Sequence, residues 1–332
     1  MTRGLRSTSL PETNSNVWRY IILMRKKYFF AILVICLLFA VSGCDGDIGN
    51  IFSLGSGSNS SKNWLCFTSS AENSTITTKL TEDPGTLTEP IPVIEYSIDN
   101  GKTWKIFTFS FYDNSTHQFT SEGTTVTLAQ GEKVYLRAKS KNDSFCYTDD
   151  FTIRNISFVM TGSVAASGNI MSLLDNKCAL KEIPCKVCFL SLFEDCTVLT
   201  SAPELPAAGL EEACYSDMFK GCAALVSAPA LPAVELSSGC YASMFENCSA
   251  LEEAPDLPAE SLKYSCYNYM FRGCTALKSM KVYFNSWRDD LQCTADWAHY
   301  VPEGGSFYYK SGLDVSEKNN NKVPTGWTAT QF

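Results

Sequence analysis

The sequence predicts an α+β protein: a small β-sandwich, then a short solenoid of repeats with a C-terminal cap. The solenoid follows from a period of 26 residues, marked by Cys188, Cys214, Cys240 and Cys266. A fixed period of 20 to 50 residues is typical of stacked repeats, because one repeat cannot bury its own apolar face. The sandwich follows from residues 63–157, where short β-rich runs alternate with Asn, Asp, Gly and Ser.

The N-terminal region predicts an export signal at residues 1–43. A basic run at Arg25–Lys27 precedes an apolar run at Tyr28–Val41, which is shorter than the roughly 20 residues that span a bilayer. The run ends in Val-Ser-Gly-Cys44, which resembles the bacterial lipobox and implies that Cys44 becomes the lipidated first mature residue. An ordinary signal peptide and a buried helix are the alternatives. Residues before Met24 are polar and irregular, so Met24 is the expected translation start.

A lipidated Cys44 implies attachment to a membrane through acyl chains rather than a spanning helix. Residues 44–62 would form the anchor and a flexible Gly/Ser/Asn-rich linker, with a reach of about 25 Å. Acidic residues at Asp45 and Asp47 resemble the surface-export signals of some Gram-negative lipoproteins, so we expect an outer-membrane, cell-surface location. Loss of residues 1–43 changes the formal net charge from −8 to −13, which argues against a nucleic-acid partner.

In the expected β-sandwich, four runs alternate as strands do: Trp64–Thr68, Ile94–Ser97, Thr124–Leu128 and Val134–Ala138. The segment Ser97–Trp104 reads S-x-D-x-G-x-T-W, which resembles the Asp-box of sialidase-type propellers. That resemblance implies a hairpin in which the Asp accepts turn hydrogen bonds and the Trp packs beneath. Propellers carry several copies and this chain carries one, so we expect a structural hairpin and not a sialidase.

Each repeat has two parts. Cys214, Met218, Phe219 and Cys222 share one face of a two-turn helix, so Cys214–Cys222 is predicted to be helical. Leu225–Leu231 cannot continue that helix past its prolines and is expected to be extended, in a parallel sheet of short strands.

The motif also carries a family resemblance. The order F-x-x-C-x-x-L-x-x-A-P-x-L-P at Phe219–Pro232 resembles the signature of BspA-type leucine-rich-repeat surface proteins. The C-Y-x-x-M-F and A-P-x-L-P-A forms resemble its lipoprotein branch in Gram-negative gut anaerobes. The resemblance implies a leucine-rich-repeat solenoid over residues 158–284. Residues 285–332, with an aromatic run and Trp327, would then form the cap.

The 15 cysteines do not form a recognisable metal site. Zinc favours paired Cys-x2–4-Cys motifs, and only Cys185 and Cys188 have that spacing. Repeat cysteines eight apart on a helix would lie about 12 Å from each other, so we expect buried, reduced thiols. Cys66 and Cys146 remain a possible disulfide. With two histidines and no catalytic, nucleotide or zinc motif, no enzyme activity, metal or cofactor is expected.

We therefore expect a non-enzymatic binding or adhesion module on the cell surface, acting through the solenoid on an unknown protein or glycan. The alternative is a glycan-binding accessory lipoprotein of a polysaccharide uptake system, with β-domain aromatics such as Tyr112 stacking on sugars. Partner contact is expected where the repeats differ around the Ala-Pro step: Thr200, Ser201, Glu204, Val226, Ser227, Ala230, Glu252, Glu253 and Asp256.

Overall fold

The computed structural model describes residues 63–82, 90–113, 115–148 and 153–332. The export signal, Cys44 and the linker lie outside these residues. Ser60–Phe332 forms one compact unit. Its described part contains strands β1 to β16 and two short 3-10 turns, η1 (Ile170–Leu173) and η2 (Asp289–Leu291), but no α-helix. The expected α+β class, with its solenoid of alternating strands and helices, is therefore wrong. Nor do these residues contain a helix that could cross a membrane.

The N-terminal region is built from two sheets. The first has the order β12-β11-β1-β8-β3-β4, with bounds Leu199–Ser201, Val164–Ser167, Leu65–Ser69, Lys133–Ala138, Ile94–Ser97 and Lys105–Phe107. The second has the order β6-β5-β2-β10-β9, with β7 also paired to β2. Its bounds are Gln118–Ser121, Ser110–Asp113, Ser74–Glu82, Ile153–Thr161, Tyr147–Thr148 and, for β7, Val126–Leu128. The four strands expected from the sequence correspond to β1, β3, β7 and β8.

Alternating side chains explain how the two sheets share one core. In β8, Val134, Leu136 and Ala138 are fully buried, whereas the residues between them are at least partly exposed. Across the core, the rings of Phe67 in β1 and Phe158 in β10 lie 5.1 Å apart, edge to face.

No break separates the sheets from the repeats. Strand β10 crosses the boundary expected at residues 157/158. The amide of Phe158 in that strand donates to the carbonyl of Leu192 in the first repeat at 2.8 Å, and β11 pairs in parallel with β12. Both sheets therefore continue directly into the repeats.

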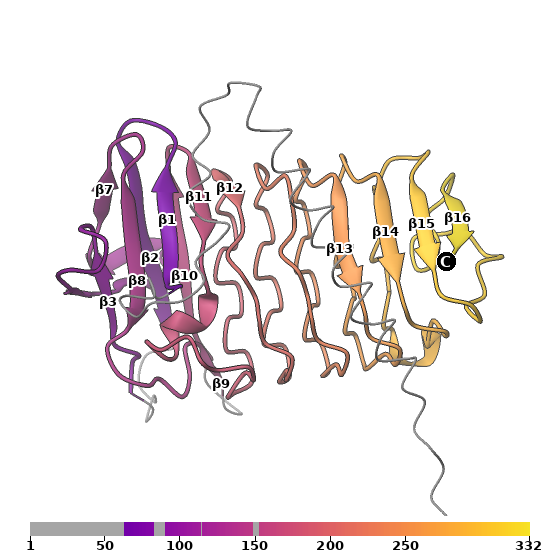
Figure 1. Ribbon diagram of the computed structural model, residues 1–332, viewed down its shortest axis with the longest axis horizontal. Coiled ribbons are helices and arrows are strands. Elements are labelled where there is room, and N and C mark those ends of the chain that lie inside the picture. The colour runs from indigo at the N-terminus through magenta and orange to yellow at the C-terminus, as the bar shows by residue number, and fades with distance from the viewer. Residues whose placement is uncertain (1–62, 83–89, 114, 149–152) are drawn as a thin grey trace, which may run out of the picture. The chain divides into compact units, whose positions relative to one another are not determined.

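We call each 26-residue unit a coil and number the coils 1 to 4 from Cys188, Cys214, Cys240 and Cys266. Each coil has a turn segment, which begins at that cysteine, and an extended segment. The extended segments lie side by side as parallel strands (Figure 1). The last of them belong to a parallel sheet of β13 (Glu253–Leu257), β14 (Ser279–Val282), β15 (Ser306–Tyr309) and β16 (Thr328–Gln331). The expectation of short parallel strands is confirmed.

The turn segment, which we expected to be helical, is a ladder of tight turns. Its amides alternate between two acceptors. The N–H of Met218 donates to the carbonyl of Tyr215 three residues earlier, at 3.3 Å, whereas the N–H of Phe219 donates to Met244 in the next coil, at 2.9 Å. Every fourth residue is left-handed, as at Asp217 (φ 55°) and Gly221 (φ 74°), and an α-helix of L-residues excludes this conformation. The chain thus makes a turn every four residues, and half of its hydrogen bonds join neighbouring coils.

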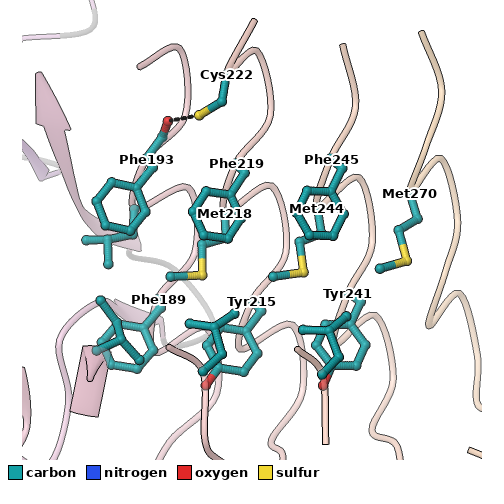
Figure 2. Close-up of a cluster of buried hydrophobic side chains, with 14 of the residues drawn as sticks. Phe189, Phe193, Tyr215, Met218, Phe219, Cys222, Tyr241, Met244, Phe245 and Met270 are labelled. Carbon is teal, nitrogen blue, oxygen red and sulfur yellow. Dashed lines mark hydrogen bonds between the residues drawn. The ribbon is translucent and has the colours of Figure 1, made fainter. Parts of the chain in front are cut away.

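The interior consists of columns of equivalent side chains. Phe193, Phe219, Phe245 and Phe271 stack with ring centroids 5.4 to 5.9 Å apart and planes within 5°. A second column places Phe189, Tyr215, Tyr241 and Tyr267 at 5.9 to 6.1 Å. Methionines 218, 244 and 270 lie between the two columns (Figure 2). The expected contact between Phe219 and Phe245 is confirmed.

The C-terminal residues close the last coil. The expected strand near residue 307 is β15, and Trp327 is only 1% exposed. Its indole N–H donates to the carbonyl of Pro302 at 2.6 Å. Trp287 and Trp297 pack on each other and on Phe307. These aromatic rings cover the open end of the columns.

Candidate functional site

All nine residues proposed for partner contact lie on extended segments of coils 1 to 3. Backbone bridges set their register: Ser227 pairs with Glu253, Glu253 with Ser279, and Ser279 with Ser306. Equivalent positions therefore lie beside one another on adjacent coils. We call this surface the coil face and define it as residues 200–204, 226–230, 252–256 and 278–283, extended by the exposed Tyr308 of β15 and by Phe332, which follows β16.

In coil 1, two of the predicted contact residues are used by the fold. The hydroxyls of Thr200 and Ser201 donate to the carbonyls of Val164 and Ala166 at 3.2 and 2.8 Å, joining β12 to β11. Glu204 is exposed, and its carboxylate accepts a hydrogen bond from the Asn63 amide at 2.6 Å. Glu204 therefore remains the best placed of the three to meet a partner.

In coil 2, the coil face is apolar. Val226 is 53% exposed, and Ser227 and Ala230 are also exposed. Ala230 and Glu204 border an open groove of about 320 Å³ between coils 1 and 2. Its walls are mainly prolines and small apolar residues: Ala202, Pro203, Leu205, Pro206, Pro229 and Pro232. The rigid proline backbone gives this groove a preformed shape.

In coil 3, the face becomes charged, and two of its three outward carboxylates have a partner on coil 4. Glu252 pairs with Lys278 at 2.9 Å and Asp256 with Lys281 at 3.0 Å. Hydrogen bonds to Tyr283 and Asp256 raise the pKa of Lys281. Glu253 is exposed between these pairs.

The sequence reasoning missed an aromatic cluster at the end of this face. The rings of Tyr283 and Phe332 lie 5.1 Å apart, with Lys281 Nζ 5.2 and 5.1 Å from their respective centroids. Tyr308 pairs with Lys281 in the strand register and is 39% exposed. Coil 4 lacks the Ala-Pro step, so the differences between repeats around that step did not indicate these residues. The aromatic run of β15, in which Tyr308 alternates with the buried Phe307, was the available signal.

The Asp-box forms the expected hairpin. One carboxylate oxygen of Asp99 accepts from the amides of Lys102 and Thr103 at 3.0 and 2.9 Å, and the other accepts from the Thr103 hydroxyl at 2.6 Å. These hydrogen bonds, led by that of the Thr103 hydroxyl, hold the pKa of Asp99 well below the usual range. Trp104 packs edge to face against Trp64 at 4.8 Å. Both carboxylate oxygens of Asp99 accept hydrogen bonds within the turn, which makes this carboxylate structural.

The repeat cysteines are buried as expected, but their spacing does not follow helical geometry. The thiols of Cys222, Cys248 and Cys274 each donate to the carbonyl of the phenylalanine 29 residues earlier, at 3.1 Å; the first of these bonds is drawn in Figure 2. Burial raises the pKa of Cys248 to about 12, so its thiol stays protonated near neutral pH. A cysteine at this position thus fills space and also supplies a weak donor.

Cysteines at two other places have a different environment. Contact with a neighbouring thiol lowers the pKa of Cys185, next to Cys188, and of Cys293, next to Cys266. Cys66 and Cys146 are both buried and free in this structure. The described residues contain no cluster of three or more His, Cys, Asp or Glu side chains that could hold a metal ion.

Comparisons with known proteins add no assignment: no family model, no curated protein and no solved structure matches this chain.

Proposed function

We propose that the chain is a non-enzymatic binding protein of the bacterial cell surface, and that the coil face is where a protein partner binds. One observation carries the proposal. Val226, Ser227 and Ala230 of coil 2 differ from their equivalents in coil 3, residues 252, 253 and 256, and all six are exposed on this face. The residues common to the coils fill the interior, with Phe219, Phe245, Cys222 and Cys248 all fully buried. The common residues build the array, which leaves the variable ones available for recognition.

The composition of the coil face supports a protein partner. The face combines an apolar groove at Ala230 between coils 1 and 2, ion pairs such as Asp256–Lys281 between coils 3 and 4, and the exposed rings of Tyr308 and Phe332 at its far end. Interfaces between proteins combine an apolar centre with a polar rim and are enriched in aromatic residues. Since Lys281 and Lys278 are already paired with carboxylates, this surface offers no large excess of positive charge to a nucleic acid.

Lipidation at Cys44 is the second part of the proposal and rests on the sequence and on the resemblance to BspA-type lipoproteins. An acyl anchor followed by a flexible linker would hold the coil face outside the membrane of a Gram-negative cell. A fatty-acid analogue fed to expressing cells should label the wild type and not Cys44→Ser. Equal labelling of both proteins would contradict this part.

Binding through the coil face can be tested with two matched variants of coil 2. Ala230→Glu places a carboxylate in the proline-lined groove, whereas Val234→Glu places one at another exposed position, 58% exposed and outside the lining. The detergent-solubilised full chain would be applied to an array of host and bacterial surface proteins. We expect Ala230→Glu to weaken binding to the captured protein about tenfold or more and Val234→Glu to leave it unchanged. Equal binding by both variants would exclude the groove as the contact.

A further inference from the structure

A second hollow lies away from the coil face, on the outer surface of the second sheet. It has a volume of about 350 Å³, within the range of small-molecule sites. Its floor is formed by β2 and β10 and its far wall by the turn segment of coil 1. We call it the β-domain groove; the side chains that give it its chemistry are Lys79, Thr81, Asn155, Ser157, Glu194 and Asp195.

Several polar groups in this groove have no hydrogen bond to another described residue. Lys79 and Ser157 pair across β2 and β10 in the strand register, and neither side chain has a hydrogen-bond partner among the described residues. The same is true of the Asp195 carboxylate, which is exposed at the wall. Asn155 accepts a weak bond from the Cys146 thiol at 3.4 Å, which leaves its amide N–H groups to donate. An amine, a hydroxyl and an amide from β2 and β10 therefore border one hollow, with Asp195 at its wall and the Oδ1 of Asp195 against Gly221 of coil 2.

An aromatic pair stands next to the groove. Tyr112 in β5 lies on the same outer face as Lys79, whose Nζ is 4.1 Å from the centre of its ring. Phe119 in β6 contacts Tyr112 edge to face at 5.1 Å and is 48% exposed. The lysine thus links the aromatic pair to the polar hollow.

The charged residues of the β-domain groove restrict the chemical class of ligand that it can bind. One basic residue, Lys79, and two acidic residues, Glu194 and Asp195, line the groove, and Lys220 of coil 2 lies 3.6 Å from the Glu194 carboxylate. This balance disfavours phosphates, nucleic acids and acidic sugars, because a groove without an excess of positive charge does not attract anions. The polar lining disfavours an acyl chain, because hydrogen-bonding groups buried under it would lose water without compensation.

We infer that the β-domain groove binds a neutral carbohydrate. A sugar ring offers hydroxyls that both donate and accept, which suits Lys79, Asn155 and Ser157 together. It also offers apolar C–H faces that pack on exposed rings such as Phe119 and Tyr112. This site is separate from the coil face and does not depend on the protein-binding role proposed for it.

The test uses the detergent-solubilised full chain on an array of neutral and acidic oligosaccharides, followed by calorimetric titration of the best neutral binder. Ser157→Trp fills the groove from its floor. Thr161→Trp is the matched control, because it adds the same side chain four residues along the same strand, on the same face but outside the groove. We expect Ser157→Trp to weaken binding about tenfold or more, and Thr161→Trp to leave it unchanged. Tyr112→Ala, which removes one aromatic ring without filling the groove, should also weaken it.

Each other outcome counts against the inference. Absence of any neutral oligosaccharide binder overturns it, as does binding restricted to acidic sugars. Equal affinity of the wild type and Ser157→Trp for the oligosaccharide would show that it binds elsewhere on the protein. If Ser157→Trp does not fold, Tyr112→Ala and Asn155→Ala decide, and unchanged affinity in both overturns the inference. Ala230→Glu should retain carbohydrate binding, which separates failure of the groove from failure of the coil face.

Discussion

Phe245→Ala should destabilise the whole coil array. Phe245 is fully buried, with parallel rings on both sides, Phe219 at 5.6 Å and Phe271 at 5.9 Å. Truncating a buried phenylalanine costs about 3 to 5 kcal/mol, and each lost ring contact accounts for roughly 0.5 to 1.5 kcal/mol of it. Both neighbours are fixed by their own hydrogen bonds between coils, so the cavity cannot readily collapse. We expect a loss near the upper end, out of a total stability of about 5 to 15 kcal/mol.

Thermal unfolding followed by circular dichroism provides the assay. A loss of about 4 kcal/mol corresponds to a fall in Tm of roughly 10 °C for a unit of this size. Glu253→Ala is the control, because Glu253 is exposed on a neighbouring strand, and it should change stability by less than about 0.5 kcal/mol. If Phe245→Ala unfolds at the wild-type temperature, the columns do not hold the coils together.

Three further predictions concern the tyrosine column, the charged side chains of the turn segments and the Asp-box. Tyr241→Phe should leave stability unchanged or raise it by up to about 1 kcal/mol in denaturant titrations, because its buried hydroxyl has no partner among the described residues; a loss above about 1 kcal/mol would mean that the hydroxyl is bonded. The Lys220 ammonium lies 3.6 Å from Glu194 and 3.9 Å from Glu246. Lys220→Glu should therefore lower the free energy of unfolding by about 1 kcal/mol or more at low salt and by less at high salt. A loss of stability that does not depend on salt would exclude charge as its cause. The pKa of Asp99 is lowered in the folded protein, so its ionised form stabilises the fold at pH values above the unfolded-state pKa, near 3.9. This contribution is lost as the pH falls through the lower pKa of the folded state. An NMR titration of the Asp99 carboxyl that gave an ordinary pKa would contradict the hairpin geometry.

The repeat period, the buried set and the extended segments could be predicted from the sequence, because apolar spacing reports directly on burial. The turn segment could not. Cys214, Met218 and Cys222 recur every four residues, and a short helix of 3.6 residues per turn fits that spacing almost as well. What decides between them is the left-handed backbone at Asp217 and Gly221 and the hydrogen bonds to the next coil, neither of which hydrophobic spacing reports.

The candidate sites show a similar division. Differences between repeats placed Glu204, Ala230 and Asp256 on one face, but they did not show that Thr200 and Ser201 bind neighbouring carbonyls. The β-domain groove could not be predicted from the sequence, because it joins side chains from β2, β10 and coil 1 that lie far apart in the chain. Tyr112 was singled out as an aromatic, yet its neighbours depend on how β5 pairs with β2.

The stacking of residues 26 apart positions the coil face and can be measured directly by methyl NMR. In the structure, Met218, Met244 and Met270 form one row, each a single coil from the next (Figure 2). With the methionine methyl groups labelled, nuclear Overhauser contacts should join Met218 to Met244 and Met244 to Met270. Substituting each methionine in turn would assign the signals. Absence of both contacts in the folded protein would contradict the stacked-coil arrangement.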